Sequence, residues 1–398
     1  MEKPVTLTEK RPVTVKPEAS RLRRFNDWFH LWVGIASGIP VIIISLTGAL
    51  LVFEHEILEM SRSWWKVEIP ADATPLPPSV IRSRVAEQLP EMKVRRLWYY
   101  GEGRPVKITP DNSDSLIFVS PYTGRVLALE DHENVFEFIE EGHFHLWLPD
   151  KIGTQVVSWS TAVFFFLLVT GMVLWWPKKW SGRDVKQAFT IKWKARFKRI
   201  NYDLHNVLGF YTLSLAVIMA FTGLMMGFAF FNKSVLKMLG GQDGSPEVTV
   251  IDDGPETVPA TLEGKVDHIW KLVTTEMGEF EKDQISIHFP KEDGKFIYAC
   301  TDMYHGTWRE LYFDIHTLAL LSTSQSKIAE DTPANWLRRS NFSLHVGAFG
   351  GLLTKWLFFF ASLVCATLPV TGFYIWWGKR RKKPGKKGGT RLRTVKGR

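Results

Sequence analysis

Apolar and polar positions alternate in long blocks along this chain. Four stretches carry almost no charge, at residues 31–53, 154–176, 206–231 and 353–377. A helix of this length spans roughly 35 Å, which exceeds the ~30 Å hydrocarbon core of a bilayer. The pattern therefore predicts four transmembrane helices. The fold class that we expect is a membrane α-helical protein with a four-helix bundle.

The two long segments between these stretches have the pattern of small α+β domains. In the first, "PPSVIRSRVAEQL" has a proline start and helical spacing, and "KVRRLWYY" and "SLIFV" alternate like strands. The second repeats the order, with "GKVDHIWKLVTTEM" as a helix and "DQISIHF", "KFIYACT" and "WRELYFDI" as strands. We expect one such domain in each of these two segments.

Charge predicts the sidedness of the chain. Of 50 Lys and Arg residues and 41 Asp and Glu residues, 27 basic and 6 acidic ones lie in residues 1–29, 177–204 and 378–398. Basic segments stay in the cytoplasm, so both termini are predicted to be cytoplasmic in a bacterial inner membrane. The same bias accounts for "KRRKKPGKK", and we expect no nucleic-acid partner.

Together these patterns give a predicted domain organisation. It consists of a cytoplasmic tail (1–29), a first span (30–53), a first periplasmic domain (54–142), a second span (143–176), a basic cytoplasmic loop (177–204), a third span (205–231), a second periplasmic domain (232–340), a fourth span (341–377) and a basic cytoplasmic tail (378–398).

The chain contains an internal repeat. "RFNDWFHLWVG" begins at residue 24 and "RINYDLHNVLGFY" at residue 199, with Arg, Asn, His and Gly at the same spacing and 175 positions apart. The tryptophan doublets at 175–176 and 376–377 match at a distance of 201 positions. Because each half has two spans, the halves are predicted to be parallel repeats related by an axis along the membrane normal. Matching residues then face each other at one depth.

Four histidines fall at the ends of the spans in two matching pairs. His30 and His205 open the first and third spans on the inner side, and His145 and His345 precede the second and fourth on the outer side. A single interfacial histidine is ordinarily an anchor, and a zinc site needs three or four ligands. Two imidazoles facing each other across a bundle suit the two axial positions of haem. His143 remains an alternative to His145, because residues two apart cannot share one helix face.

The sequence resembles a known family at several of these motifs. "DLHNVLGFY", "FHLW" with "TGMVLWWP", "SLHVGAFGG" with "TGFYIWW", and the "SPYTGRVL" turn are similar to the PepSY-associated transmembrane family, and most to its ferrioxamine-type siderophore reductases of the inner membrane. The resemblance implies PepSY-like periplasmic domains and two b-type haems with His30, His205, His145 and His345 as axial ligands. It also implies electron transfer from the cytoplasm to a periplasmic ferric siderophore. "DIHTLAL" departs from the pattern, because Leu318 stands where the first repeat has Gly124.

Three functions compete at this point. The first is a haem-dependent transmembrane oxidoreductase that reduces a ferric siderophore and releases Fe(II) during iron uptake, with electrons from a cytoplasmic donor or the quinone pool. The second is a non-catalytic regulatory or binding protein in which haem is structural or absent. A transporter is the third, and it is disfavoured because the spans are expected to lack both broken helices and buried acids. With no C-x-x-C-H motif, any haem is expected to be held without thioether bonds.

Overall fold

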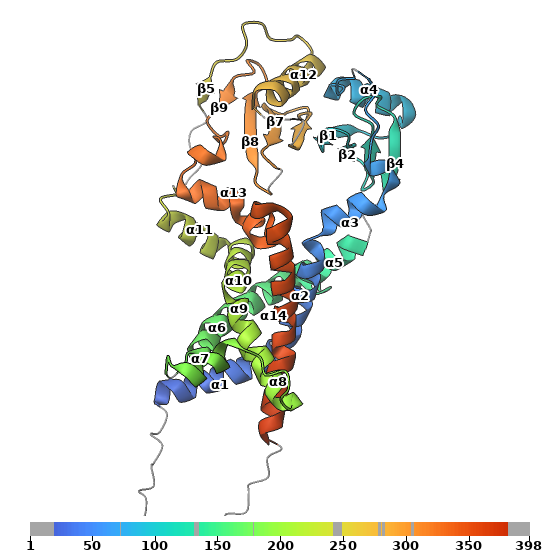
Figure 1. Ribbon diagram of the computed structural model, residues 1–398. Coiled ribbons are helices and arrows are strands. Elements are labelled where there is room, and N and C mark those ends of the chain that lie inside the picture. The colour runs from blue at the N-terminus through green and yellow to red at the C-terminus, as the bar shows by residue number, and fades with distance from the viewer. Residues whose placement is uncertain are drawn as a thin grey trace, which may run out of the picture.

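A computed structural model describes residues 20–71, 73–130, 135–177, 179–241, 249–277, 280, 283–303 and 306–380. In it, a bundle of helices stands beneath a β-sheet that is covered by two further helices (Figure 1). The predicted tails lie outside the described residues up to position 19 and from position 381 onward.

The bundle is built from the apolar stretches that the sequence marks out. Two helices within it are long and apolar enough to cross a membrane, and the number rises to four if each of two bent pairs is one span. The bundle comprises α1 (Arg21–Ala36), α2 (Gly38–Leu51), α6 (Asp150–Trp175), α8 (Phe197–Asp203), a π-helical turn (Leu204–Leu208), α9 (Gly209–Tyr211), α10 (Leu213–Gly227) and α14 (Gly351–Arg380).

The first and third predicted spans are bent, contrary to the expectation of straight helices. The bends are 64° between α1 and α2 and 63° between the helix ending at Tyr211 and α10. At the first bend, Pro40 has no N–H to donate to the preceding turn, and the Ser37 hydroxyl donates to Val33 O at 2.9 Å. At the second, the Thr212 hydroxyl donates to Leu208 O at 2.8 Å. Both features are known causes of kinks.

Shorter helices lie beside the bundle or on the sheet, and two of them, α5 and α13, come immediately before the long helices α6 and α14. They are α3 (Glu54–Ser61), α4 (Pro78–Gln88), α5 (Val135–His145), α7 (Gly182–Phe189), α11 (Ala229–Met238), α12 (Leu262–Leu272) and α13 (Pro333–Val346), with 3₁₀ turns at Ser63–Trp65, Ile328–Glu330 and Ala348–Gly350 and a π-helical turn at Val273–Met277.

The predicted strands form one sheet, not two separate domains. Its order is β4-β3-β2-β1-β6-β7-β8-β9-β5, so the halves meet where β1 pairs with β6. Leu97 lies opposite Ile287 in this antiparallel pair. Pairing β1 with β6 covers two strand edges that separate domains would expose to water. The strands are β1 (Val94–Tyr99), β2 (Val106–Pro110), β3 (Leu116–Val119), β4 (Val126–Glu130), β5 (Val250–Asp252), β6 (Ile285–His288), β7 (Phe296–Thr301), β8 (Arg309–Asp314) and β9 (Leu320–Leu321).

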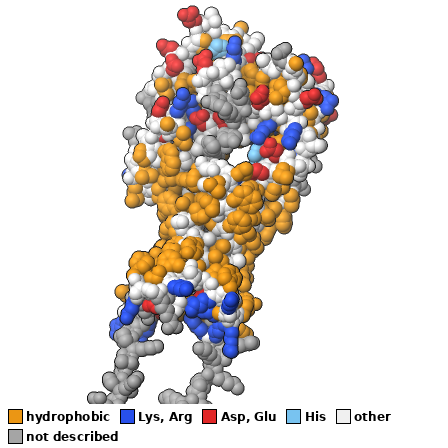
Figure 2. Space-filling view, in the orientation of Figure 1, with side chains coloured by type: hydrophobic (Ala, Val, Ile, Leu, Met, Phe, Trp, Pro, Cys, Tyr) orange, Lys and Arg blue, Asp and Glu red, His pale blue; other side chains and the backbone are white. Residues whose placement is uncertain are grey.

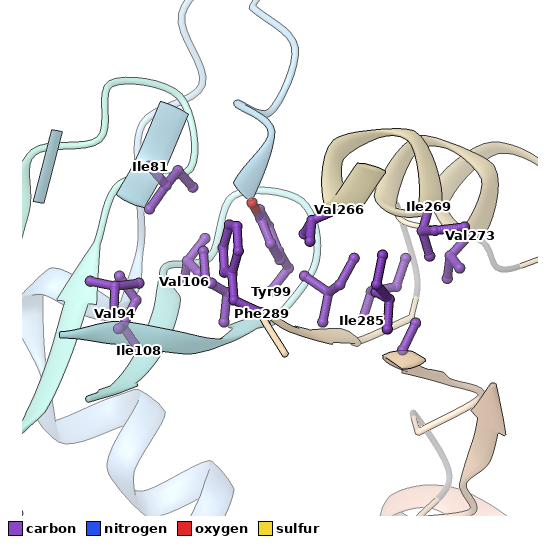
Figure 3. Close-up of a cluster of buried hydrophobic side chains, with 14 of the residues drawn as sticks. Ile81, Val94, Tyr99, Val106, Ile108, Val266, Ile269, Val273, Ile285 and Phe289 are labelled. Atoms are coloured by element: carbon purple, nitrogen blue, oxygen red, sulfur yellow. The ribbon is translucent and has the colours of Figure 1, made fainter. Parts of the chain in front are cut away.

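One hydrophobic core runs under both halves of this sheet. α4 and α12 cover one face and contribute side chains such as Ile81 and Ile269 to the core (Figure 3). Both are completely buried, as are Leu97 and Ile287 from the central strands. Burying an aliphatic side chain of this size contributes roughly 1.5–3 kcal/mol. The outer domains of the two halves are therefore one folding unit.

The surface divides into bands along the long axis. On the face that Figure 2 shows, a broad hydrophobic band covers the bundle, Lys and Arg gather at the end that carries α1 and α8, and mixed charge lies over the sheet. Large apolar side chains such as Phe166 and Phe360 are more than half exposed in the band. An apolar band of this kind is expected where lipid, not water, is the solvent.

Candidate functional site

The structure brings His30 and His205 together at the end of the bundle that carries α1 and α8, which we call the inner end; the end next to the sheet is called the outer end (Figure 1). His30 lies on α1 and His205 on the π-helical turn that follows α8. Their ring centroids are 6.4 Å apart, and the ring planes are nearly perpendicular, at 87°. The two residues come from opposite halves of the chain, as the repeat predicts.

A second pair lies at the outer end, and here the structure corrects the predicted partner. His345 on α13 faces His143 on α5, with ring centroids 6.2 Å apart and planes inclined at 65°. The expectation that His145 faces His345 is wrong. His145 points to a different side of α5, where its Nδ1 lies 3.0 Å from Glu141 Oε2. Residues two apart on a helix are about 200° apart around its axis, so only one of them faces the partner half.

Each of the four paired imidazoles contacts a threonine on the other main helix of its own half. In every case the ring atom is Nδ1 and the threonine atom is Oγ1. The pairs are His30 with Thr170 at 3.0 Å, His143 with Thr47 at 3.2 Å, His205 with Thr371 at 2.9 Å and His345 with Thr222 at 2.9 Å.

The direction of these bonds follows from what else the threonines do. Each hydroxyl already donates to a backbone carbonyl of the preceding turn; Thr47, for example, donates to Ile43 O at 2.7 Å. Its oxygen is then left to accept from the imidazole. His143 Nδ1 also lies 3.0 Å from Ile44 O, and a carbonyl can only accept. The equivalent carbonyl, three residues before the threonine, also bonds the imidazole at the other three sites.

The tautomer of all four rings is therefore fixed. Nδ1 carries the proton and Nε2 carries a free lone pair. Second-shell hydrogen bonds of this kind orient a metal-ligating histidine and increase its basicity.

A glycine follows each of these threonines and makes room for the ring. A Cβ added at Gly48 would lie 2.8 Å from His143 Cε1, and one at Gly171 would lie 3.1 Å from His30 Cε1. At Gly372 and Gly223 the corresponding distances to His205 and His345 are 3.3 and 3.4 Å. The imidazole thus packs directly on helix backbone at all four positions.

An asparagine one helical turn before each inner histidine adds a further contact. Asn26 Nδ2 donates to Thr170 O at 3.3 Å, and Asn201 Nδ2 donates to Thr371 O at 3.0 Å. These bonds tie the same two helices that the histidine–threonine bonds connect. The asparagine, histidine and threonine therefore form one unit that occurs twice at the inner end.

The residues of each pair fit a metal centre held between two axial imidazoles. Each pair offers two Nε2 lone pairs, and a Lewis acid bound between the two rings would satisfy both. Metal–imidazole bonds are about 2.0–2.1 Å long, so two such bonds in line place the ring centroids roughly 6 Å apart. The observed 6.4 and 6.2 Å agree with that value. The donor set is bis-imidazole with no thiolate, which is compatible with haem.

The two pairs lie at different depths in the bundle. Thr170 bonds His30 at the inner pair, whereas Thr161, on the same helix, lies against Gly223 beside His345 at the outer pair. Nine helical positions separate the two threonines, which corresponds to about 14 Å. The arrangement can therefore hold two similar centres one above the other.

A solvent-open cavity of ≈ 500 Å³ lies between the β7–β9 side of the sheet and α13, the helix that carries His345. A volume of this order suits a small-molecule ligand. Its lining combines aromatic rings with charged groups, including Phe296, Trp308, Tyr312, Glu310, Arg338 and Arg339.

Several ionisable groups in the outer domain have pKa values that are shifted away from the neutral range. Burial, together with the charges of Arg96 and Arg95, lowers the pKa of His288 to about 4. Burial raises the pKa of Cys300 to about 12 and also lowers the pKa of His55, which packs against Trp65. A neutral buried imidazole and a buried thiol are typical of structural positions, so we assign no catalysis to them.

Sequence reasoning named His143 only as the alternative to His145, and it missed the four threonines as parts of the site. A pattern existed: Thr-Gly occurs at 47–48, 170–171, 222–223 and 371–372, each time within an apolar stretch. The same dipeptide also occurs at 123–124, in a turn of the outer domain, so it is specific only together with the apolar context.

Comparison with known proteins gives one match. A family model described as "PepSY-associated TM region" matches residues 28–379. A search of curated proteins finds no match for the chain.

Proposed function

Because this chain belongs to the family of proteins with a PepSY-associated TM region, we propose that it is a di-haem reductase of the bacterial inner membrane that acts on periplasmic ferric siderophores. His30 and His205 would hold an inner haem b, and His143 and His345 an outer one. Each haem would supply a one-electron redox centre. The observation that carries the proposal is the two imidazole pairs, in which Nδ1 makes the hydrogen bonds found among the described residues and Nε2 is left as the ligand atom.

The reaction is a one-electron reduction. A quinol or a cytoplasmic reductant gives up one electron, and Fe(III) in the chelate accepts it and becomes Fe(II). Hard oxygen ligands hold the softer Fe(II) less well, so the iron leaves without any bond of the siderophore breaking. The protein needs no nucleophile or general base for this reaction.

The chain's own residues have three tasks in this scheme. The threonines hold the Nδ1 protons and so keep every Nε2 available as a ligand. The apolar band keeps both centres in a medium of low dielectric. The aromatic and charged cavity beside α13 offers a place for the chelate close to the helix that carries His345. The inner-membrane location and cytoplasmic termini belong to the same proposal and rest on the charge bias.

The test begins with absorption of the purified full-length protein in detergent, reduced minus oxidised. We expect a b-type spectrum with about two haems per chain. The reduced protein, mixed anaerobically with ferric siderophore and an Fe(II)-specific chromophore, should reoxidise with release of one Fe(II) per electron. A colourless protein, or haem that stays reduced with hydroxamate and catecholate chelates alike, would overturn the proposal and favour a regulatory role.

A further inference from the structure

The turn between α5 and α6 gathers three side chains of metal-binding type. Glu141, His145 and Asp150 each offer one ligand atom, and these atoms all lie within 4.8 Å of one another. The Glu141 carboxylate and the His145 ring are already in contact, at 3.0 Å. None of the three takes part in the imidazole pairs described above.

The chain builds this arrangement from a helix end and a tight turn. Glu141 and His145 are one helical turn apart, so they share a face of α5. Leu146 and Trp147 then adopt positive φ angles of 54° and 56°, which reverse the chain and place Asp150 at the start of α6 next to His145. Non-glycine residues rarely adopt such angles. The Trp147 indole holds the turn by donating to Phe138 O at 2.8 Å.

The second half of the molecule makes the equivalent turn without these ligands. At the offset of 202 positions that relates His143 to His345, Glu141 and His145 correspond to Ser343 and Gly347. Gly347 also has a positive φ, of 72°. The turn therefore folds in this bundle without a carboxylate or an imidazole, and the three side chains in the first half are available for another purpose.

The position of the three residues relates them to the outer imidazole pair. His143 faces His345, and His145 follows two residues later on another side of the same helix. The Phe144 ring lies between the two imidazoles, 5.5 Å from that of His143 and 6.3 Å from that of His145. Glu141 and Asp150 are exposed, so an ion from solution reaches the three residues directly.

We propose that Glu141, His145 and Asp150 bind a divalent first-row transition-metal ion. One imidazole and two carboxylates form a mixed nitrogen and oxygen donor set that suits Fe²⁺, Mn²⁺ or Zn²⁺, and the remaining coordination positions stay open to water or to a chelator. The two negative charges neutralise the dication. Asp150 closes the site by a rotation of its exposed side chain.

Such a site has a direct use beside a ferric reductase. Fe(II) released at the outer end would meet a ligand set that holds it more tightly than water and less tightly than a closed cage. This use rests on the proposed function, whereas the binding itself does not.

The experiment measures binding of the metal alone. Mn²⁺ is titrated into the purified full-length protein in detergent, and free Mn²⁺ is followed by its electron paramagnetic resonance signal. The variants are His145→Ala and Asp150→Asn. The matched control is His316→Ala, which removes an exposed imidazole from the outer domain. Fe²⁺ added anaerobically to the Mn²⁺ complex then tests competition for the same site.

We expect about one bound Mn²⁺ per chain, displaced by Fe²⁺, with affinity weakened about tenfold or more in both site variants and unchanged in the control. The far-ultraviolet circular dichroism spectrum and the thermal midpoint should not change in any of them, which shows that the variants fold. Binding that survives both site variants, or no binding in the unaltered protein, would overturn the proposal. The experiment contains neither a ferric chelate nor an electron donor. Its result can therefore be interpreted even if the reductase proposal is wrong.

Discussion

The two halves of the molecule agree closely inside the bundle and differ at the outer turns. In both halves the inner histidine bonds a threonine of the long second helix, and the outer histidine bonds a threonine of the first. At the outer turn, however, the first half has His145 where the second has Gly347. The histidine–threonine bonds, which both halves share, hold the four imidazoles. The residues that differ between the halves lie at the outer end of the bundle.

This difference distinguishes residues that support the imidazoles from residues that act at the outer surface. Residues that hold the imidazoles occur in both halves, because each member of a pair needs the same support. Residues that act at the outer surface need to occur only once. Substitutions at equivalent positions of the two halves are therefore the most informative experiments, and those at the shared positions should have the largest effects.

Removing an outer imidazole should have the largest effect of all. His143→Ala and His345→Ala should each abolish the outer centre and so remove about half of the bound haem, because the remaining axial ligand faces an empty position. His145→Ala should retain both haems and serves as the matched control on the same helix. Haem content by absorption decides the matter. Equal haem content in the His143→Ala and unaltered proteins would contradict the proposed ligand.

Removing a threonine hydroxyl should weaken haem binding without abolishing it. Thr170→Val and Thr371→Val leave the Nδ1 protons of His30 and His205 without the hydroxyl acceptor, and loss of such a partner typically costs 10–100-fold in affinity. Equal effects in the two halves would confirm their equivalence. Thr161→Val, on α6, is the control, because that hydroxyl donates to Val157 O and, among the described residues, contacts no imidazole nitrogen. Haem retention during dialysis and the midpoint potential are the readouts.

Adding a methyl group next to each outer imidazole should have a smaller effect, and one that differs between the two halves. Gly48→Ala puts a Cβ 2.8 Å from the His143 ring and should displace it, whereas Gly223→Ala allows 3.4 Å to His345. Alanine itself favours a helix by about 1 kcal/mol over glycine, so Gly223→Ala should be neutral or stabilising. Haem content and thermal midpoint measured side by side test this order. A reversed order would mean that the two outer rings sit differently.

The smallest effect is expected where β1 pairs with β6, as a dependence of the free energy of unfolding on pH. His288 on β6 lies opposite Arg96 on β1, and its pKa is lowered to about 4 by burial and by nearby arginines. The neutral ring is favoured in the folded state, so its contribution is fully present above pH 6.5 and is lost as the pH falls toward 4. The expected loss is about 1–3 kcal/mol.

Thermal unfolding between pH 7.5 and 4.5 measures this effect. Since carboxylates also titrate in that range, the comparison is between the slopes of the unaltered protein and of His288→Gln. A shallower slope in the variant is expected, and identical slopes would refute the assignment.

Much of this structure can be predicted from the sequence, and the predictions that fail do so for physical reasons. Hydrophobic blocks located the bundle helices, and period-two alternation located strands such as Val94–Tyr99. The facing of His30 and His205 followed from the repeat. The choice between His143 and His145 did not, because it depends on where α5 ends, and the two halves make that turn with different residues.

Two further features depend on tertiary contacts that the chain pattern does not encode. The joining of both outer domains through β1 and β6 is a choice of edge partners, which local periodicity cannot specify. Leu318 stands where the first half has Gly124, and the sequence alone leaves that turn uncertain, yet the φ angles of the two residues are 58° and 67°. Asp314 stabilises the unfavourable leucine conformation by accepting from the backbone N–H groups of His316 and Thr317 at 2.8 Å each.

The shared sheet also determines how the molecule can move. Carriers that expose a site alternately to the two sides of a membrane do so by rocking one repeat against the other. Here that rotation would break the backbone ladder between β1 and β6 and the ion pair between Glu56 and Lys355, whose atoms lie 2.6 Å apart. The two repeats are therefore one mechanical body. A protein built in this way keeps its inner and outer imidazole pairs at a constant separation, which agrees with the electron transfer that we propose.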